Sequence, residues 1–276
     1  MHPKALLDHC AALLAQVLRF DHPADAIVSR YFRENRQLGQ RERGTLAETV
    51  FAVLRYKARF EMLARSGSGP KERRLAILGF AAWLKACDAV QDSELLPVPR
   101  HNLPQWLATE LEAQLGERFM AVAESFLQPA PLDLRVNTLK AKRADVQKAL
   151  NAEGLASQST PWTPWGLRLQ GKPALTRLEL FKQGAIEIQD EGSQLLALLL
   201  DARRGEMVVD FCAGAGGKTL AIGASMRNTG RLYAFDVSAH RLENLKPRLA
   251  RSGLSNVHPA AISHERDERI KRLAGK

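Results

Sequence analysis

Cysteine is scarce in this chain of 276 residues, and long apolar runs, internal repeats and low-complexity segments are absent. The three cysteines, Cys10, Cys87 and Cys212, are scattered, so they form neither a disulfide framework nor the paired spacing of a zinc site. The longest apolar run, Leu195–Leu200, is far shorter than the ~20 residues of a membrane-spanning helix. We therefore expect a monomeric protein of the reducing cytoplasm, with no metal site and no membrane partner.

Acidic residues are in the minority. The chain has 40 Lys and Arg against 30 Asp and Glu, which gives a formal net charge of +10 and a sequence pI of about 9.8. An apolar fraction of 45% is enough for an ordinary globular core. The charge balance favours a polyanionic partner, of which nucleic acid is the simplest, while a merely soluble basic protein is the alternative.

The first 127 residues show the spacing of helices throughout. Apolar residues recur at helical intervals over Leu6–Leu18, and further helices are expected over 24–34, 40–64 and about 71–87. Two short helices are expected on either side of Gly116. We interpret residues 1–127 as an all-helical domain.

The pattern changes after Pro129 and Pro131. Leu132, Leu134 and Val136 alternate with other residues, which is the period of a strand. A helix over 143–153 and short strands near 167–169 and 185–188 complete a small α+β module, which we place at 128–188.

From residue 189 onward, strands and helices alternate. After a helix over 190–200, this alternation consists of strands at 207–211, 231–235 and 257–262 with helices at 218–226 and 239–252. Such alternation predicts a parallel, doubly wound sheet. We expect the first part of a Rossmann-like domain over 189–276.

A glycine-rich turn, Cys212–Thr219, joins the first of these strands to a helix. Its glycines allow a ligand to approach the backbone closely, and the helix N-terminus offers free N–H groups. One candidate ligand is a P-loop nucleotide. The end of that motif fits Gly217-Lys218-Thr219, but Cys212 stands where its first glycine should be.

The other candidate is a Rossmann-type nucleoside. Gly214 and Gly216 open the turn, and Asp236 ends the next strand 20 residues after Gly216, where a carboxylate can accept hydrogen bonds from ribose hydroxyls. Thr219 in place of a third glycine, together with Asp210, favours S-adenosylmethionine over NAD. The plainer alternative is that the glycines merely make a tight turn and Asp236 caps the next helix.

These residues resemble the Sun/Fmu (RsmB-type) family of RNA cytosine-5 methyltransferases. Asp210–Thr219 is similar to the family's cofactor motif, and three more segments occur in the family's order, namely Leu134–Leu139, Gly184–Gln194 and Ala234–Val237 with Arg241-Leu242. The resemblance covers about residues 130 to 276. A weaker resemblance, carried by Leu38–Arg43 and Val53–Arg55, relates residues 1–127 to a NusB-like RNA-binding domain and leaves 128–188 as an RRM-like module.

The resemblance implies S-adenosylmethionine as cofactor and assigns roles. The backbone of the turn would hold the methionine part of the cofactor, through Cys212, Ala213, Gly214, Ala215, Gly216, Gly217 and Lys218. Asp236 would bind the ribose, and Arg241 would lie beside that pocket. Arg135 and Asn137 would help to position RNA or would brace the cofactor domain.

The chain departs from the family pattern in two places. Many members have proline where this chain has Ala215, a change that the turn should tolerate. Members usually place an acid near the adenine after the third strand, where this chain has Ser263 or His264, so the resemblance does not supply that contact.

Methylation at carbon 5 of cytosine needs a cysteine thiolate that first adds to carbon 6. The family supplies its cysteines from a Pro-Cys and a Thr-Cys-Ser segment, and neither string occurs here. Cys212 should face the cofactor, whereas Cys10 and Cys87 fit buried structural positions. We therefore expect no catalytic residue, a truncated cofactor domain with three of the usual seven strands, and no methyl transfer by this chain alone.

Basic residues crowd the second and third expected helices. We expect Arg41, Arg43 and Arg55 to contact RNA, together with Arg30, Arg33, Arg36, Lys57 and Arg59. A solvated helix face is the alternative. Ribosomal RNA is the expected partner before transfer RNA. The rival functions are a P-loop NTPase and a non-catalytic RNA-binding protein.

Overall fold

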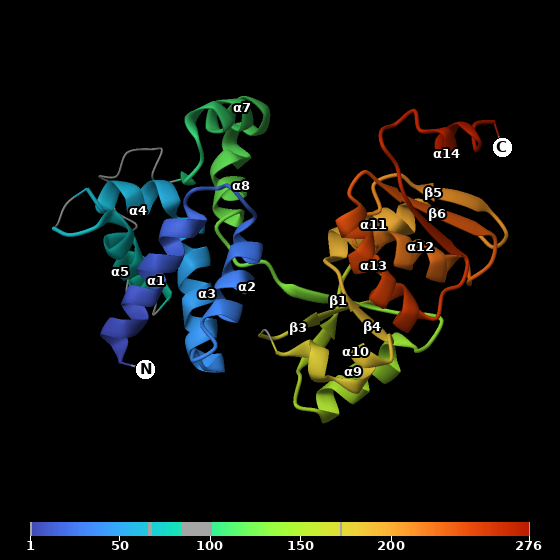
Figure 1. The fold of residues 1–276 in the computed structure, drawn as a ribbon, viewed down its shortest axis with the longest axis horizontal. Helices are drawn as coiled ribbons and strands as arrows, with labels where there is room; N and C mark the ends of the chain where they lie inside the picture. Colours follow the sequence, from blue (N-terminus) through green and yellow to red (C-terminus); the bar gives the residue numbers. More distant parts are fainter. Residues whose placement is uncertain (1, 66–67, 84–100, 172, 276) are drawn as a thin grey trace. The chain divides into compact units, whose positions relative to one another are not determined.

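A computed structural model describes residues 2–65, 68–83, 101–171 and 173–275. The chain divides into two compact units, Met1–Pro129 and Ala130–Lys276, each of which is described by itself (Figure 1). Cys87 and the last residues of the helix expected over 71–87 lie outside the described residues.

The first unit is helical throughout its described part. Its elements are α1 (Pro3–Val17), α2 (Ala24–Glu34), α3 (Gln40–Arg55), α4 (Lys57–Leu63), α5 (Lys71–Trp83), α7 (Gln105–Leu115), the 3-10 turn η2 (Gly116–Arg118) and α8 (Phe119–Ser125). The core is formed by apolar side chains of α1 to α5, and Leu13, Leu14, Leu46 and Leu75 are fully buried. A smaller cluster around Phe119 joins α7 to α8.

One helix expected from the sequence is wrong, because residues 40–64 form two helices that break at Tyr56. In a continuous helix the Arg59 N–H would donate to the Arg55 carbonyl. Here the side chain of Asn102 replaces that bond, since its Nδ2 donates to the Arg55 carbonyl and its Oδ1 accepts from the Arg59 N–H at 3.3 Å. The break therefore depends on a residue more than 40 positions away.

The second unit begins with a four-stranded antiparallel sheet of order β2-β3-β1-β4. Its elements are β1 (Leu132–Val136), α9 (Arg143–Ala152), β2 (Ser157–Ser159), β3 (Gly166–Leu169), η3 (Leu175–Arg177), α10 (Glu179–Lys182) and β4 (Ile186–Ile188). Leu134 pairs with Leu167 on one side and with Ile188 on the other. The Leu134 side of the sheet packs against α9 and α10 to form a core. The short polar strand β2 was not expected from the sequence.

A three-stranded parallel sheet of order β5-β6-β7 follows. Its elements are α11 (Glu191–Leu199), β5 (Met207–Asp210), α12 (Gly217–Ser225), β6 (Arg231–Asp236), α13 (Ala239–Ser252), β7 (Val257–Ala261) and α14 (Glu268–Lys271). Leu232 and Ala234 share a core with α11, α12 and α13. The opposite face carries alternate residues of β5, and Met207 and Val209 are about 40% exposed.

The α/β fold class expected from the sequence is confirmed, with a helical N-terminal region followed by sheets. Three parallel strands joined by helices have the connectivity of a Rossmann-like domain. The boundary at residues 188 and 189 stays a prediction, because the whole of 130–276 forms one unit. Among the described residues, no helix is long and apolar enough to cross a membrane.

Candidate functional site

The turn between β5 and α12 uses glycine where the backbone requires it. Gly214 and Gly216 have φ values of 54° and 83°, in the left-handed region that disfavours other residues. A Cβ atom on Gly216 would also overlap the side chain of Leu245, and one on Gly214 would lie 2.9 Å from the Arg241 guanidinium. The turn therefore passes close to α13, and the Arg241 guanidinium lies beside it.

Asp236 holds the turn to the neighbouring strand. Its Oδ2 accepts from the Gly214 N–H at 2.8 Å, and its Oδ1 accepts from the Ser238 N–H at 2.8 Å. The plainer interpretation, in which Asp236 caps the next helix, is wrong, because the N-cap of α13 is Ser238. The Asp236 carboxylate instead holds the turn. Each oxygen still has a second lone pair, so the same carboxylate can also accept hydroxyl groups.

A hydrogen bond between Thr219 and Asp210 also joins the first turn of α12 to the end of β5. The Thr219 hydroxyl donates to Asp210 Oδ2 at 2.6 Å, and Thr219 is fully buried. In a P-loop the equivalent hydroxyl must be free to bind a magnesium ion. This bond therefore argues against the P-loop alternative.

The N-terminus of α12 has unused hydrogen-bond donors. Among the described residues, the backbone N–H groups of Gly217, Lys218 and Thr219 have no acceptor. Gln189 Nε2 is buried, also has no partner, and lies 3.6 Å from the position of a Cβ on Gly217. These groups converge where the helix dipole favours a negative group.

Two side chains of the turn are open to solvent. Lys218 and Cys212 are exposed. Burial raises the pKa of the nearby Asp190 carboxyl, but hydrogen bonds from Ser193 and the charge of Lys218 outweigh burial and hold that pKa below its ordinary value. Lys218 therefore lies close enough to Asp190 to balance its charge.

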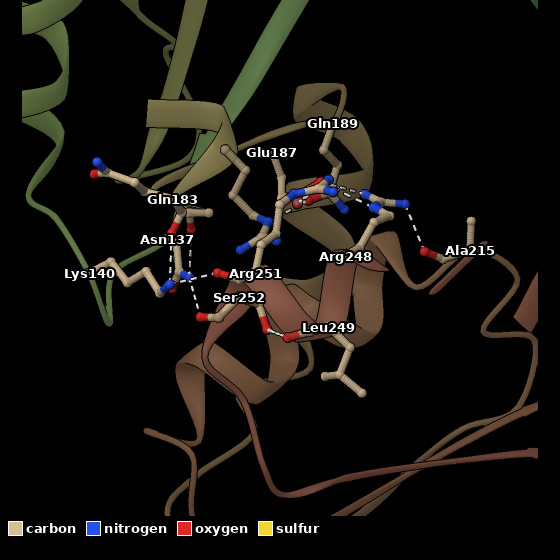
Figure 2. A network of polar contacts seen from close by, with 12 residues as sticks. Asn137, Lys140, Gln183, Glu187, Gln189, Ala215, Arg248, Leu249, Arg251 and Ser252 are labelled. Atoms are coloured by element: carbon tan, nitrogen blue, oxygen red, sulfur yellow. Dashed lines mark hydrogen bonds and ion pairs between the residues drawn. The ribbon is translucent and has the colours of Figure 1, made fainter. Parts of the chain in front are cut away.

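Arg135 and Asn137, which we expected to position RNA or to brace the cofactor domain, are both buried. Asn137 Nδ2 donates to the Gly184 carbonyl at 3.0 Å and to the Ser252 carbonyl at 2.9 Å (Figure 2). Arg135 Nε donates to Gln189 Oε1 at 2.8 Å. Burial lowers the pKa of Arg135 to about 10, although the charge of Glu187 opposes that shift. Neither side chain has surface to offer RNA, so the structure favours the bracing role.

Three charged residues of the same network were missed by sequence reasoning. The buried Glu187 of β4 is paired with Arg248 and Arg251 of α13, at 3.0 and 2.7 Å (Figure 2). Glu187 alternates with the apolar Ile186 and Ile188, which places it on the opposite face of the strand. That alternation was a usable signal for its face, but nothing local in the sequence identified its partners.

The charged face of the antiparallel sheet also bears on RNA binding. In an RRM, aromatic side chains on this face stack on bases. Here Asp133, Arg135 and Glu187 occupy the face, and Asp133 accepts hydrogen bonds from Arg168 and from the Glu191 N–H. This face is used to join the sheet to α11 and α13, so it does not resemble an RNA-stacking surface.

The basic cluster of the first unit is only partly free. Arg41 is exposed, as are Arg30, Arg33 and Arg36. Arg43 donates to the Leu38 carbonyl at 2.9 Å and thereby holds the loop before α3. Arg55 lies 3.7 Å from Glu48. Of Arg41, Arg43 and Arg55, Arg41 alone is therefore exposed.

The two described cysteines have different surroundings. Cys10 is fully buried in the helical core, and burial raises the pKa of its thiol to about 12. Cys212 is exposed at the turn. The described residues contain no group of three or more His, Cys, Asp or Glu side chains that could hold a metal ion.

Two protein-family models match the chain. A model described as a ferredoxin-like domain of RsmF/B-like methyltransferases matches residues 103–176, and a model described as 16S rRNA methyltransferase RsmB/F matches residues 197–272. The first match begins just before α7, so it includes the last helices of the first unit as well as β1 to β3. The second match contains the turn and Asp236.

A curated relative and two solved structures agree with these matches. A probable ribosomal RNA small subunit methyltransferase B from Synechocystis sp. is 34% identical over 160 residues, which is 57% of this chain and 36% of the relative. A methyltransferase homolog from Pyrococcus horikoshii is 35% identical with a TM-score of 0.55, covering 62% of this chain and 57% of its own. The protein PH0851 is 20% identical with a TM-score of 0.72, covering 94% of this chain and 69% of its own, and shows the fold alone. The match thus spans little more than a third of the length of the Synechocystis relative.

Proposed function

We propose that this chain, which carries two domains of the RsmB/RsmF methyltransferase family, forms the cofactor-binding part of an S-adenosylmethionine-dependent enzyme that methylates carbon 5 of cytosine in ribosomal RNA. The name of the Synechocystis relative supplies the ribosomal RNA substrate. The cofactor and the chemistry rest on the site itself and on the resemblance of its motifs.

The residues present fit S-adenosylmethionine. Its carboxylate matches the unpaired N–H groups at the start of α12 and the unpaired Gln189 Nε2. Its ribose hydroxyls match the remaining lone pairs of Asp236. Val237, which follows that acid, is 70% exposed and offers an apolar surface to the adenine. When bound, the cofactor supplies an electrophilic methyl group on a sulfonium centre.

The observation that carries the proposal is the pairing of Asp236 with a turn whose Thr219 is locked to Asp210. An acid at the end of β6 suits a nucleoside ribose, whereas the buried Thr219 hydroxyl does not suit a magnesium-bound triphosphate. The same turn sequence therefore favours the methyl donor over ATP.

The described cysteines do not suit the attack on carbon 6. Cys10 lies in the core of the helical unit with a raised pKa, so its thiol stays protonated. Cys212 belongs to the turn that would hold the cofactor. We propose that the described residues bind cofactor and RNA and do not include the nucleophile. We expect no 5-methylcytosine from this chain alone, and its formation would overturn this assignment.

We propose that the helical unit contributes to RNA binding. The exposed arginines on and beside α2 and α3 provide positive charge, namely Arg30, Arg33, Arg36 and Arg41. Phosphate contacts of this kind give affinity that falls with salt.

Isothermal titration of the chain with S-adenosylhomocysteine, and separately with ATP and magnesium, tests the cofactor assignment. We expect S-adenosylhomocysteine to bind and ATP to give no heat. Binding of ATP alone would replace the proposal with the P-loop alternative. Strong RNA binding without any affinity for S-adenosylhomocysteine would favour a non-catalytic RNA-binding protein.

A further inference from the structure

Arg248 touches two parts of the second unit at once. Its Nη1 donates to the Ala215 carbonyl in the turn at 2.7 Å, while its Nε and Nη2 lie 3.1 and 3.0 Å from Glu187 Oε2 (Figure 2). Ala215 belongs to the turn, whereas Glu187 belongs to the antiparallel sheet. One guanidinium therefore connects the turn to a sheet that supplies none of the turn's own residues.

Glu187 is a fixed point for this connection. Its side chain is buried, and its other oxygen, Oε1, accepts from Arg251 Nε at 2.9 Å. The Arg251 guanidinium lies 4.4 Å from the centre of the Phe181 ring, which limits its movement. With both oxygens held, the Glu187 carboxylate cannot turn away from Arg248.

Hydrogen bonds to backbone carbonyls also attach this part of the unit to the end of α13. Lys140 Nζ donates to the Arg251 carbonyl at 2.6 Å, and Asn137 donates to the Ser252 carbonyl. Gly184 lies so close to the Arg251 carbonyl that a Cβ would overlap it. The distance between β4 and α13 is therefore set by contacts that do not involve Arg248.

The turn needs a contact from outside to hold its conformation, because two of its residues are left-handed glycines, which have many accessible conformations. The Ala215 carbonyl lies in the same peptide plane as the Gly216 N–H, which donates to the Ala213 carbonyl at 2.8 Å. Arg248 donates a hydrogen bond to the carbonyl oxygen of the same peptide plane. The plane precedes the unpaired N–H groups of Gly217 to Thr219, so its tilt sets where those donors point.

We propose that Arg248 is a positioning residue for the turn and that it couples the binding of ligand at the turn to the docking of the antiparallel sheet on α13. This inference rests on the proposed function, because the ligand that it positions is the methyl donor. Coupling of this kind is reciprocal, so ligand at the turn must also stabilise the contact between β4 and α13.

Two variants of the intact chain separate positioning from stability. Arg248→Met and Arg251→Met each remove one ion pair with Glu187, but only the first removes the bond to the Ala215 carbonyl. We expect the Kd for S-adenosylhomocysteine to rise about tenfold in Arg248→Met and less than twofold in Arg251→Met, with similar losses in Tm.

Amide exchange provides the second readout. In the unsubstituted chain, S-adenosylhomocysteine should slow exchange over Ile186–Ile188, and Arg248→Met should abolish this effect at saturating ligand. If Arg248→Met fails to fold, Glu187→Gln keeps the shape but loses the charge, and we expect a Kd raised about threefold.

The inference is overturned if both methionine variants bind as the unsubstituted chain does, if both weaken binding equally, or if Glu187→Gln, used as the replacement, binds normally. Failure of the unsubstituted chain to bind S-adenosylhomocysteine would instead contradict the proposed function, so the two failures are distinguishable.

Discussion

The arginines of the two units have different surroundings. In the helical unit, Arg30, Arg33 and Arg41 project into solvent. In the second unit, Arg135 is buried, and Arg248 and Arg251 are about four-fifths buried around the Glu187 carboxylate. Both groups contribute equally to the net charge of the chain. Only the first group is free to contact phosphates, whereas the second group connects the two sheets and the turn to one another.

The comparison shows that a basic composition does not locate an RNA surface. A buried guanidinium must be paired within the protein, because leaving it unpaired is costly. Such arginines cannot contact RNA, whatever the net charge of the sequence. The predictions below test whether polar side chains are free in the helical unit but buried and paired in the second unit.

The cysteines should show the largest contrast. Raising the pKa of Cys10 from 9.0 to about 12 reduces its thiolate fraction at pH 8 roughly a thousandfold. Iodoacetamide labelling followed by peptide mapping should therefore modify Cys212 in the native chain and leave Cys10 unmodified until the helical unit unfolds. The thiol of Cys10 should become reactive only as pH approaches 12. Native labelling of Cys10 at pH 8 would show that this core opens.

Removing Asn137 should destabilise the second unit most among the single polar changes. Asn137→Ala leaves the carbonyls of Gly184 and Ser252 and the N–H of Leu139 without their partner. We expect a loss of about 3 kcal/mol in the free energy of unfolding, measured by urea titration with tryptophan fluorescence. Arg41→Ala, the exposed control, should change it by less than about 0.5 kcal/mol. Equal losses in the free energy of unfolding for the two variants would contradict the difference between the polar side chains of the two units.

Asp236 should matter to ligand binding more than an exposed acid does. We expect Asp236→Ala to raise the Kd for S-adenosylhomocysteine about thirtyfold, because both the ribose contact and the support of Gly214 are lost. Asp201→Ala, which removes an exposed acid paired with Arg203, should leave the Kd unchanged. Titration calorimetry checks both, and normal binding by Asp236→Ala would exclude Asp236 from the site.

RNA binding should depend on the first unit's exposed charge. Changing Arg30, Arg33 and Arg41 together to alanine should weaken binding of a ribosomal RNA fragment about tenfold and reduce the slope of log K against log salt by about 2 to 3. The matched control changes three exposed arginines of the second unit to alanine, namely Arg203, Arg204 and Arg227. Fluorescence anisotropy at several salt concentrations measures both. An equal effect of the two triplets would mean that RNA responds to charge alone.

The sequence predicted local structure better than it predicted contacts between distant residues. The alternation of Leu132, Leu134 and Val136 identified β1, and the apolar strands before the turn and before Asp236 identified β5 and β6. The strand β2 escaped because Ser157–Ser159 is short and polar. The break at Tyr56 could not be foreseen because Asn102, which makes it possible, is distant in sequence.

The candidate site shows the same division. Glycine at positions 214 and 216 could be identified from the sequence, because the left-handed backbone of the turn demands it. The acid at 236 could be identified from its spacing at the end of the next strand. The role of Arg248 could not, since it arises only when α13 brings that side chain between Glu187 and the Ala215 carbonyl. The burial of Arg135 and Asn137, which argues against a contact with RNA, likewise appears only in the folded chain.

Amide hydrogen exchange can show whether the methyl donor binds at the turn between β5 and α12. We expect saturating S-adenosylhomocysteine to slow exchange at Gly217, Lys218 and Thr219, whose N–H groups have no acceptor among the described residues. Protection should extend to Asp236 and Val237, while α1 to α5 stay unchanged. Exchange at the turn that is unaffected by saturating ligand, with protection elsewhere in the chain, would show that the ligand binds at another place.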